Sequence, residues 1–424
     1  MKELLAIPET IWRKALEYWR KLWLRVLLFG VFALLTAATT QFIDRLIPSN
    51  LAQTISGDAA DRLLNIIANA MLAVTIFSLT VMVNVYRSSS SQFTPRVHRL
   101  IMQDSTTQNT LATFIGTYVY ALTAILMREL DLVEDDRAFT LFWVTVAVLA
   151  FVVWSLVRWT LHLQTFGSLM DTTRQVERLT REELQSRASQ PCLDCNPLRP
   201  DTEIPEDATP IVAKSSGFLD QIYQDSLQEI AEEHELKIYV WHEIGTYVLM
   251  NEPIAQIVAE GELSDEARTE IYESIELGDV RTYHQDPRFG LLILSEIASK
   301  ALSPGINDPG TAIDICNRVG AVLSDYKSED PSDHEPAYDR VWFPPLKAGD
   351  LIKDGFSGLA RDGANLIEVQ ERLQKILFGL MRHPDEKLAQ AAEEAAERFS
   401  LQANAALTTE HDKARLKEIR VRRN

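Results

Sequence analysis

The chain has 424 residues and a mass of 48.0 kDa, of which 46% are hydrophobic and 24% are charged. This composition excludes a mainly disordered or fibrous chain, and 60 acidic against 42 basic residues exclude a strongly basic nucleic-acid-binding protein. The charge is unevenly distributed, because residues 1–165 carry a net charge of +2 and residues 166–424 carry −20. An apolar membrane region followed by an acidic soluble region accounts for this division.

Four apolar runs in the first 160 residues approach or reach the roughly 20 residues that a helix needs to cross a bilayer. They are Trp23–Ile43, Leu64–Tyr86, Leu111–Met127 and Ala138–Val157. Unpaired backbone polar groups are not tolerated in lipid, so these runs predict four transmembrane helices rather than strands. A signal peptide followed by buried core helices is the alternative, but more than 20 residues precede the first run and a signal peptide begins closer to the terminus.

The basic residues of the short connections predict the orientation, because basic loops stay in the cytoplasm. The connection between the second and third runs contains three arginines, and the segment before the first run is also basic (Arg87, Arg96, Arg99; Lys2, Arg13, Lys14, Arg20, Lys21). The connection between the third and fourth runs is acidic (Glu129, Asp131, Glu134, Asp135, Asp136). We therefore expect a multi-pass protein with both termini in the cytoplasm.

The interiors of the four runs contain no ionisable side chain, which argues against a proton-coupled transporter or a voltage sensor. The second run carries two pairs of polar residues, each pair one helical turn apart: Asn65 with Asn69, and Thr80 with Asn84. Such residues commonly join helices by hydrogen bonds. The functional interpretation is that they line a passive path, which the acidic outer loop would make favourable to cations. Four helices of one chain do not enclose a water-filled pore, so this interpretation requires a homo-oligomer.

The predicted fold is an α-helical integral membrane protein in which four transmembrane helices precede a cytoplasmic α+β domain. The predicted parts are an amphipathic cytoplasmic segment (1–22), the four-helix transmembrane domain (23–160), a helical stalk that continues the fourth span (161–190), a linker (191–209), a small β-rich module (210–260) and a mainly helical cytoplasmic domain (261–424). The amphipathic segment is predicted to lie in the headgroup layer, or alternatively to extend the first span into the cytosol.

The linker contains Cys192 and Cys195 in the spacing CxxC. A second ligand pair at metal-binding spacing is missing, and the eight histidines are scattered. We therefore expect no metal site and no cofactor, and a redox role for the two cysteines stays open.

The soluble half has one segment with distinctive local chemistry, Arg281–Leu323. A helix from about Pro287 to Leu302 must end at Ser303-Pro304-Gly305, and Asp308 then caps a second helix that begins with Pro309. A capped helical corner explains most of these residues. The functional interpretation is a convergent polar cluster beside helix N-termini, able to hold an anion or small ligand (Arg281, Gln285, Asp286, Asn307, Asp308). A loop over Ser328–Asp350 and helices over Ala364–Met381 and from Asp385 are predicted to follow.

The sequence resembles the bacterial family of predicted membrane proteins called domain of unknown function 2254. The resemblance rests on SSSQFTPRV after the second run, on TLATFIGTYVYAL, and on RTYHQDPRFGLLILSEIASKALSPGINDPGTAI. It implies a bacterial inner-membrane protein with four amino-terminal spans and a cytoplasmic domain, and it implies no established activity.

These observations favour an oligomeric passive pore for ions or small solutes, gated by the cytoplasmic domain. The competing hypothesis is a membrane-anchored sensor or scaffold, in which the spans only hold a soluble domain that binds a ligand or partner. An enzyme is not expected, because the sequence contains no recognisable nucleophile–base set, phosphate loop or metal-ligand spacing.

Overall fold

The computed structural model describes residues 22–43, 57–130, 132, 139–327 and 335–421. The amphipathic segment predicted for residues 1–22 and most of the predicted acidic loop lie outside these ranges. The chain divides into two compact units, Met1–Asp171 and Thr172–Asn424, which we describe in turn.

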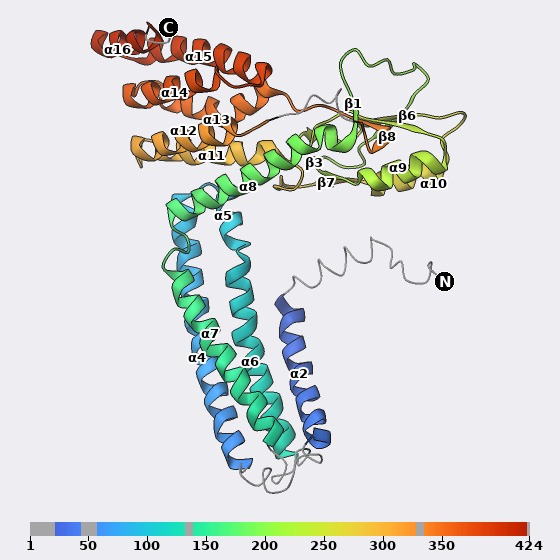
Figure 1. Ribbon diagram of the computed structural model, residues 1–424, viewed down its shortest axis with the longest axis vertical. Coiled ribbons are helices and arrows are strands. Elements are labelled where there is room, and N and C mark those ends of the chain that lie inside the picture. The colour runs from blue at the N-terminus through green and yellow to red at the C-terminus, as the bar shows by residue number, and fades with distance from the viewer. Residues whose placement is uncertain (1–21, 44–56, 131, 133–138, 328–334, 422–424) are drawn as a thin grey trace. The chain divides into compact units, whose positions relative to one another are not determined.

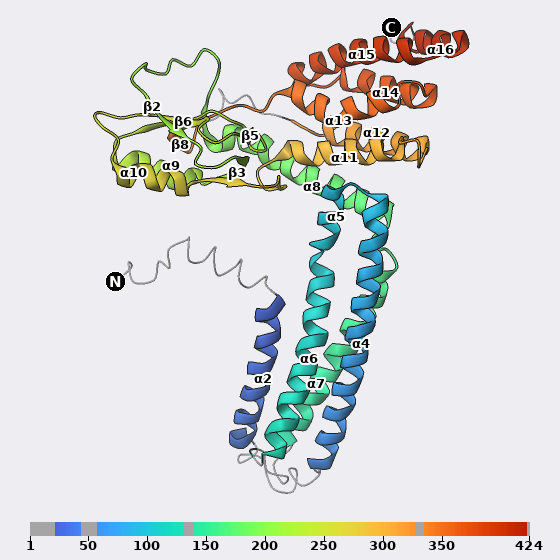
Figure 2. The same cartoon turned by 180° about the vertical axis from the view of Figure 1, so that it is seen from behind.

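The first unit is helical in the part of it that the structure describes. It contains four long helices and one short helix: α2 (Leu22–Ile43), α4 (Gly57–Gln92), α5 (Pro95–Met102), α6 (Ser105–Glu129) and α7 (Phe139–Leu163). Among the described residues, four helical segments are long and apolar enough to cross a membrane, in agreement with the sequence prediction. The four long helices run side by side (Figures 1 and 2).

The long helices pack through an apolar core that includes Leu64, Phe114 and Leu141. Gly116 of α6 permits a close approach to α2, since a Cβ atom at this position would lie 2.3 Å from the ring of Phe29. Polar contacts also join the helices of this bundle: the Tyr120 hydroxyl of α6 lies 3.2 Å from the Thr145 hydroxyl of α7, and Arg128 of α6 pairs with Asp61 of α4.

The fourth span does not continue as an unbroken stalk, so this part of the prediction is wrong. Helix α7 ends at Leu163, and α8 (Leu169–Ser189) begins after five residues of turn. Gly167 adopts a φ of +76°, which a right-handed helix does not accommodate. The helical spacing of polar and apolar residues across 160–188 cannot reveal such an interruption, because it resumes on the other side.

The second unit contains two β-sheets. The strands are β1 (Cys195–Pro197), β2 (Thr209–Val212), β3 (Gly217–Ile222), β4 (Lys237–Val240), β5 (Tyr247–Val248), β6 (Pro253–Val258), β7 (Ile275–Gly278) and β8 (Tyr338–Phe343). The larger sheet has the order β1-β8-β4-β6-β2, with β8 parallel to both β1 and β4 and the other pairs antiparallel. The smaller sheet has the order β5-β3-β7 and is antiparallel. A 3-10 turn at Pro191–Asp194 precedes β1, and helices α9 (Gln224–Glu233) and α10 (Asp265–Glu273) complete this part.

Strands extend beyond the predicted module of residues 210–260. The segment predicted as the loop Ser328–Asp350 contains β8, and β7 lies in a region that was predicted to be helical. Val341 and Phe343 of β8 are fully buried against the core of the larger sheet. The partner strands of β8 lie more than 100 residues earlier in the chain, so no local sequence pattern predicts this pairing.

The remaining helices form three stacked pairs (Figure 1). They are α11 (Pro287–Ala301) with α12 (Pro309–Ser324), α13 (Ala348–Asp362) with α14 (Ile367–Leu380), and α15 (Glu386–Ala406) with α16 (Glu410–Val421). Helix α11 contacts α13, and α13 contacts α15, while α12, α14 and α16 stack beside them. Buried Val319, Phe356 and Leu373 lie in the interior of this layer.

Candidate functional site

The loop between β7 and α11 carries the densest group of charged contacts in the second unit. Asp286 begins α11, because its side chain accepts a hydrogen bond of 3.1 Å from the backbone N–H of Phe289 and Pro287 occupies the first helical position. The sequence predicted a helix from about Pro287 to Leu302 without assigning its cap, and the structure confirms that helix as Pro287–Ala301.

Arg281 and Asp286 form a buried, bidentate ion pair. Nε and Nη2 of Arg281 donate to the two carboxylate oxygens of Asp286 at 2.8 and 3.0 Å, and Asp286 is 1% exposed. Gly245, in the β4–β5 connection, packs directly against this ion pair. Its φ is +83°, and a Cβ atom there would lie 2.2 Å from Oδ2 of Asp286. Only glycine fits this position without displacement of the ion pair.

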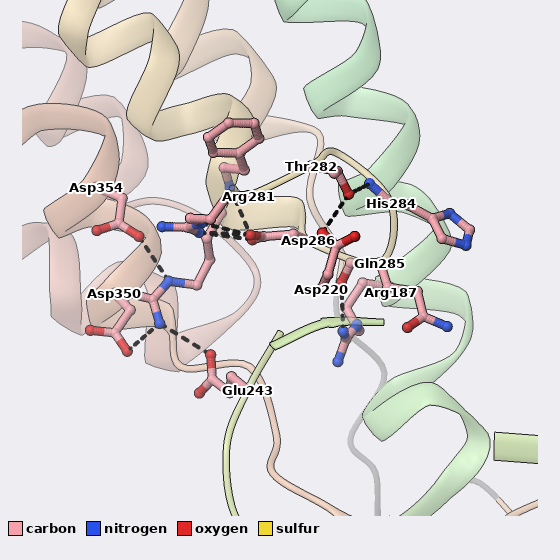
Figure 3. Close-up of polar contacts among 12 residues, drawn as sticks. Arg187, Asp220, Glu243, Arg281, Thr282, His284, Gln285, Asp286, Asp350 and Asp354 are labelled. Carbon is pink, nitrogen blue, oxygen red and sulfur yellow. Dashed lines mark hydrogen bonds and ion pairs between the residues drawn. The ribbon is translucent and has the colours of Figure 1, made fainter. Parts of the chain in front are cut away.

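Gln285 connects the same loop to the smaller sheet. Its side-chain amide exchanges two hydrogen bonds of 3.1 Å with the backbone of Ile222, the last residue of β3. Its backbone has a φ of +55°, a left-handed conformation that costs a non-glycine residue about 1 kcal/mol. Arg187 of α8 donates to the carbonyl oxygen of Gln285 at 2.9 Å, as Figure 3 shows. The loop is thus held by the sheet and by α8 in a conformation that it would not adopt alone.

Arg288, on the first turn of α11, binds three carboxylates. Its Nε donates to Asp354 at 2.8 Å, and its Nη1 donates to Glu243 and Asp350 at 3.1 Å each. Glu243 belongs to the β4–β5 connection, whereas Asp350 and Asp354 belong to α13 (Figure 3). We refer to Arg187, Arg281, Gln285, Asp286 and Arg288, with the three carboxylates, as the arginine hub. The arginine hub joins the sheets to the helical layer.

Burial controls the protonation of this cluster. Burial raises the pKa of Asp286, and the hydrogen bonds from Arg281 oppose this effect. Burial likewise raises the pKa of Glu243 against the charge of Arg288, and lowers the pKa of Arg187. Although burial acts to lower it, the hydrogen bond to Asp354 and the neighbouring carboxylates raise the pKa of Arg288. The charged states of Asp286 and Glu243 are therefore favoured by their arginine partners and opposed by burial.

The structure does not bring the five predicted ligand-binding residues together. Arg281, Gln285 and Asp286 lie before the first turn of α11, whereas Asn307 and Asp308 follow its last turn. A helix of 15 residues separates the two groups by about 22 Å. Asp308 caps α12 by accepting from the backbone N–H of Thr311 at 3.0 Å, as predicted. Two successive Asp-Pro caps looked like one cluster in the sequence because they flank the same helix.

The geometry of the arginine hub is that of a closed structural joint. Arg281 gives its bidentate face to Asp286 rather than to an anion, and Arg288 is surrounded by three acids of the chain. Among the residues that the structure describes, no group of three or more His, Cys, Asp or Glu is arranged to hold a metal ion. A ligand at Arg281 would have to displace Asp286.

Five members of the hub were not identified from the sequence: Arg187, Glu243, Arg288, Asp350 and Asp354. The contacts of Arg288 span 45 to 66 residues of sequence, so residue spacing gives no indication of them. The one available signal was an arginine on the first turn of an otherwise apolar helix, since such a group needs acidic partners when it is buried.

The four predicted pore-lining residues all lie on α4 and are all exposed on the surface of the single chain: Asn65, Asn69, Thr80 and Asn84. The amide of Asn69 donates to the carbonyl oxygen of Asn65 at 2.9 Å, and the hydroxyl of Thr80 donates to that of Ile76. The opposite face of α4 is buried through Leu64, Ile67 and Met71. These four polar residues, which we call the polar stripe, therefore face away from the other helices that the structure describes.

Large apolar side chains are exposed on all four long helices, α4 included. Helix α2 exposes Leu35, α7 exposes Phe151 and Trp154 beside Arg158, and α4 exposes Ile66, Ile76 and Phe77 between its polar residues. These apolar residues suit contact with lipid tails. Carboxamides suit it poorly, because an amide in hydrocarbon keeps donors and acceptors that lipid cannot bind.

The CxxC pair lies in a tight left-handed turn. Cys192, Leu193 and Asp194 have φ values of +53°, +58° and +59°, and both cysteines are buried. Burial raises the pKa of Cys195, which keeps it in the unreactive thiol form.

Comparisons with known proteins identify a family but no activity. The family model described as "Predicted membrane protein (DUF2254)" matches residues 19–378. The uncharacterized protein Rv1290c of Mycobacterium tuberculosis and the uncharacterized protein Mb1321c of Mycobacterium bovis are each 30% identical to the chain over 307 residues. These alignments cover 70% of the chain and 57% of each relative, so the chain matches little more than half of their length. No solved structure matches the chain significantly.

Proposed function

The chain belongs to the DUF2254 family of predicted membrane proteins, and we propose that it is a homo-oligomer whose copies meet through α4 and enclose a passive pore for ions or small solutes. The observation that carries this proposal is the outward position of Asn65, Asn69, Thr80 and Asn84. A second copy, or the water of a shared path, supplies the polar partners that lipid lacks.

The length and form of α4 support this role. Its 36 residues form a continuous helix of about 54 Å, which is longer than the hydrocarbon core of a bilayer. Within the described bundle the helices pack through apolar side chains and a few buried hydroxyls such as those of Ser78 and Thr117, and we expect the path between copies rather than inside one. We place the protein in the bacterial inner membrane with both termini in the cytoplasm, on the basis of the basic connection around Arg87, Arg96 and Arg99. The second unit would then act as the cytoplasmic gate.

Cysteine cross-linking tests the interface directly. The native cysteines Cys192, Cys195 and Cys316 are replaced by serine, and Asn84→Cys is introduced on the outward face of α4. We expect oxidation in membranes to produce cross-linked dimers. Val153→Cys, on the exposed apolar surface of α7, is the matched control and should stay monomeric. Equal cross-linking at the two positions would refute an α4 interface.

Conductance tests the pore itself. The purified full-length protein should conduct ions in planar bilayers, and Asn69→Leu or Asn84→Leu should change the unit conductance, because leucine replaces a polar group of the path. A stable oligomer that conducts nothing would refute the pore.

A membrane-anchored sensor or scaffold is the second candidate, and the arginine hub favours it. The hub couples the sheets to the helical layer through Arg288, so a ligand or partner that moves the β4–β5 connection would also move α13. In this case Arg281→Ala should abolish any thermal stabilisation that a metabolite panel produces. An unchanged melting profile across the panel would leave the hub a purely structural joint.

A further inference from the structure

The polar stripe of α4 is bounded at both ends by an exposed arginine. Arg62 precedes Asn65 by three residues, and Arg87 follows Asn84 by three residues. The two arginines are 25 residues apart, which is about seven turns and roughly 37 Å of helix. They therefore point in nearly the same direction, to within about 20°.

The arginines share their face with the stripe. At about 100° per residue, Asn65, Asn69, Thr80 and Asn84 all lie within about 60° of the direction of Arg62. The sequence between Arg62 and Arg87 contains no acidic residue. Asp61 points elsewhere, because it forms a bidentate pair with Arg128 of α6 at 2.6 and 2.8 Å. Asp58 lies one turn outside the segment that the arginines enclose.

Membrane topology alone explains only one of these charges. Basic residues accumulate on the cytoplasmic side of spans, which accounts for an arginine at one end of α4. The second arginine lies at the opposite end, whichever way the helix is inserted. Its position on the same face as the amides calls for another reason.

We infer that the path lined by α4 selects anions over cations, an inference that rests on the proposed pore. In an oligomer, Arg62 and Arg87 each repeat as a ring of positive charge, which attracts anions and repels cations. Between the rings, the carboxamides and the hydroxyl of Thr80 offer donors. Asn69 gives one N–H to its own helix and keeps a second N–H for an anion. The acidic connection from which the sequence favoured cations lies largely outside the described residues, and α4 itself favours the opposite charge.

Reversal potentials of the full-length protein test this inference. In planar bilayers with a potassium chloride gradient, we expect the wild type to pass chloride in preference to potassium. Arg62→Gln and Arg87→Gln should each lower the permeability ratio of chloride to potassium by about fivefold, the order expected from one charge close to a hydrated ion. The charge reversals Arg62→Glu and Arg87→Glu should lower it further.

Arg158→Gln is the matched control. Arg158 is an exposed arginine of α7 that packs over the ring of Trp154, so its removal deletes the same charge from a helix outside the proposed path. Conductance that prefers potassium, or a ratio that responds equally to Arg62→Gln and Arg158→Gln, overturns the anion inference and leaves the pore intact. If the Asn84→Cys variant cross-links but the wild type conducts nothing, the pore and the inference are overturned together.

Discussion

The second unit contains two helix caps that are almost identical in backbone and very different in surroundings. Asp286 and Asp308 both precede a proline, have φ values of −112° and −113°, and accept from the backbone N–H three residues on. Asp286 is buried and binds Arg281, whereas Asp308 lies near the surface. Alanine at each position removes the backbone cap, and Asp308→Ala also removes a hydrogen bond from the Thr311 hydroxyl, so a larger loss in Asp286→Ala reports the buried ion pair.

The expected magnitudes follow from these contacts. Loss of the cap in Asp308→Ala should cost about 1 kcal/mol of unfolding free energy. Asp286→Ala should cost about 4 kcal/mol, because it also leaves Arg281 buried without its carboxylate. In a unit of about 250 residues each kcal/mol corresponds to roughly 2–4 °C, so the melting temperature should fall by about 3 °C in the first variant and about 10 °C in the second.

Heat challenge of the detergent-solubilised full-length protein, followed by brief proteolysis, measures these shifts. Peptides from residues 275–300 report unfolding of the loop and of α11. Arg281→Ala and the double variant complete a thermodynamic cycle, and we expect a coupling energy of about 2–3 kcal/mol between Arg281 and Asp286. Equal shifts for Asp286→Ala and Asp308→Ala, with no coupling, would show that Asp286 is only a cap and would refute the arginine hub as a joint.

Three further predictions concern the second unit. Gly245→Ala should destabilise the protein and disturb the Arg281–Asp286 pair, because its Cβ would lie 2.2 Å from a carboxylate oxygen. Gly261→Ala is the control for the cost of a positive φ, since nothing lies within 4 Å of its Cβ. Equal melting temperatures of the two variants would contradict the steric argument. Gly290→Ala should cost about 1–3 kcal/mol, because its Cβ would lie 2.0 Å from the hydroxyl of Thr180 on α8, whereas Gly379→Ala in open space should be neutral or stabilising in the same thermal assay. Hydrogen bonds from Thr311 lower the pKa of Asp308. The cap therefore stabilises α12 fully at pH values above the ordinary aspartate pKa of 3.8, and this stabilisation is lost as the pH falls through the lowered pKa. Hydrogen exchange of α12 should show this loss in acid for the wild type and not for Asp308→Asn.

Features that depend on a few consecutive residues were predictable from the sequence. Hydropathy and length located the four candidate membrane helices, and Asp308 followed by Pro309 located the start of α12. Gly245 and Asn251 both have a positive φ, a conformation that glycine and asparagine adopt more readily than other residues. In each case one side chain, or its absence, decides the backbone conformation without help from distant parts of the chain.

Features that depend on distant partners were not predictable. The parallel pairing of β8 with β1 and β4, and the carboxylates around Arg288, exist only once the chain has folded. The same holds for the outward direction of the α4 stripe, because periodicity shows that Asn65 and Asn69 share a face but not which face is buried. The interruption at Gly167 was missed because a single glycine is also compatible with a continuous helix.

The arginine hub and the polar stripe of α4 differ in where their hydrogen-bond partners come from, and this difference is the reason why we propose a function for α4 rather than for the hub. In the arginine hub, Arg281 and Arg288 find carboxylates within the chain, and apolar residues of similar volume would hold such a joint at least as firmly. Its charges therefore hold the loop in one conformation, which includes the strained backbone of Gln285. On α4, the amides and the flanking arginines point away from every helix that packs against them in the described bundle. The arginines near the ends of the span can reach the headgroup layer, but the amides between them need a second copy or water, and the proposed pore of several copies would supply both.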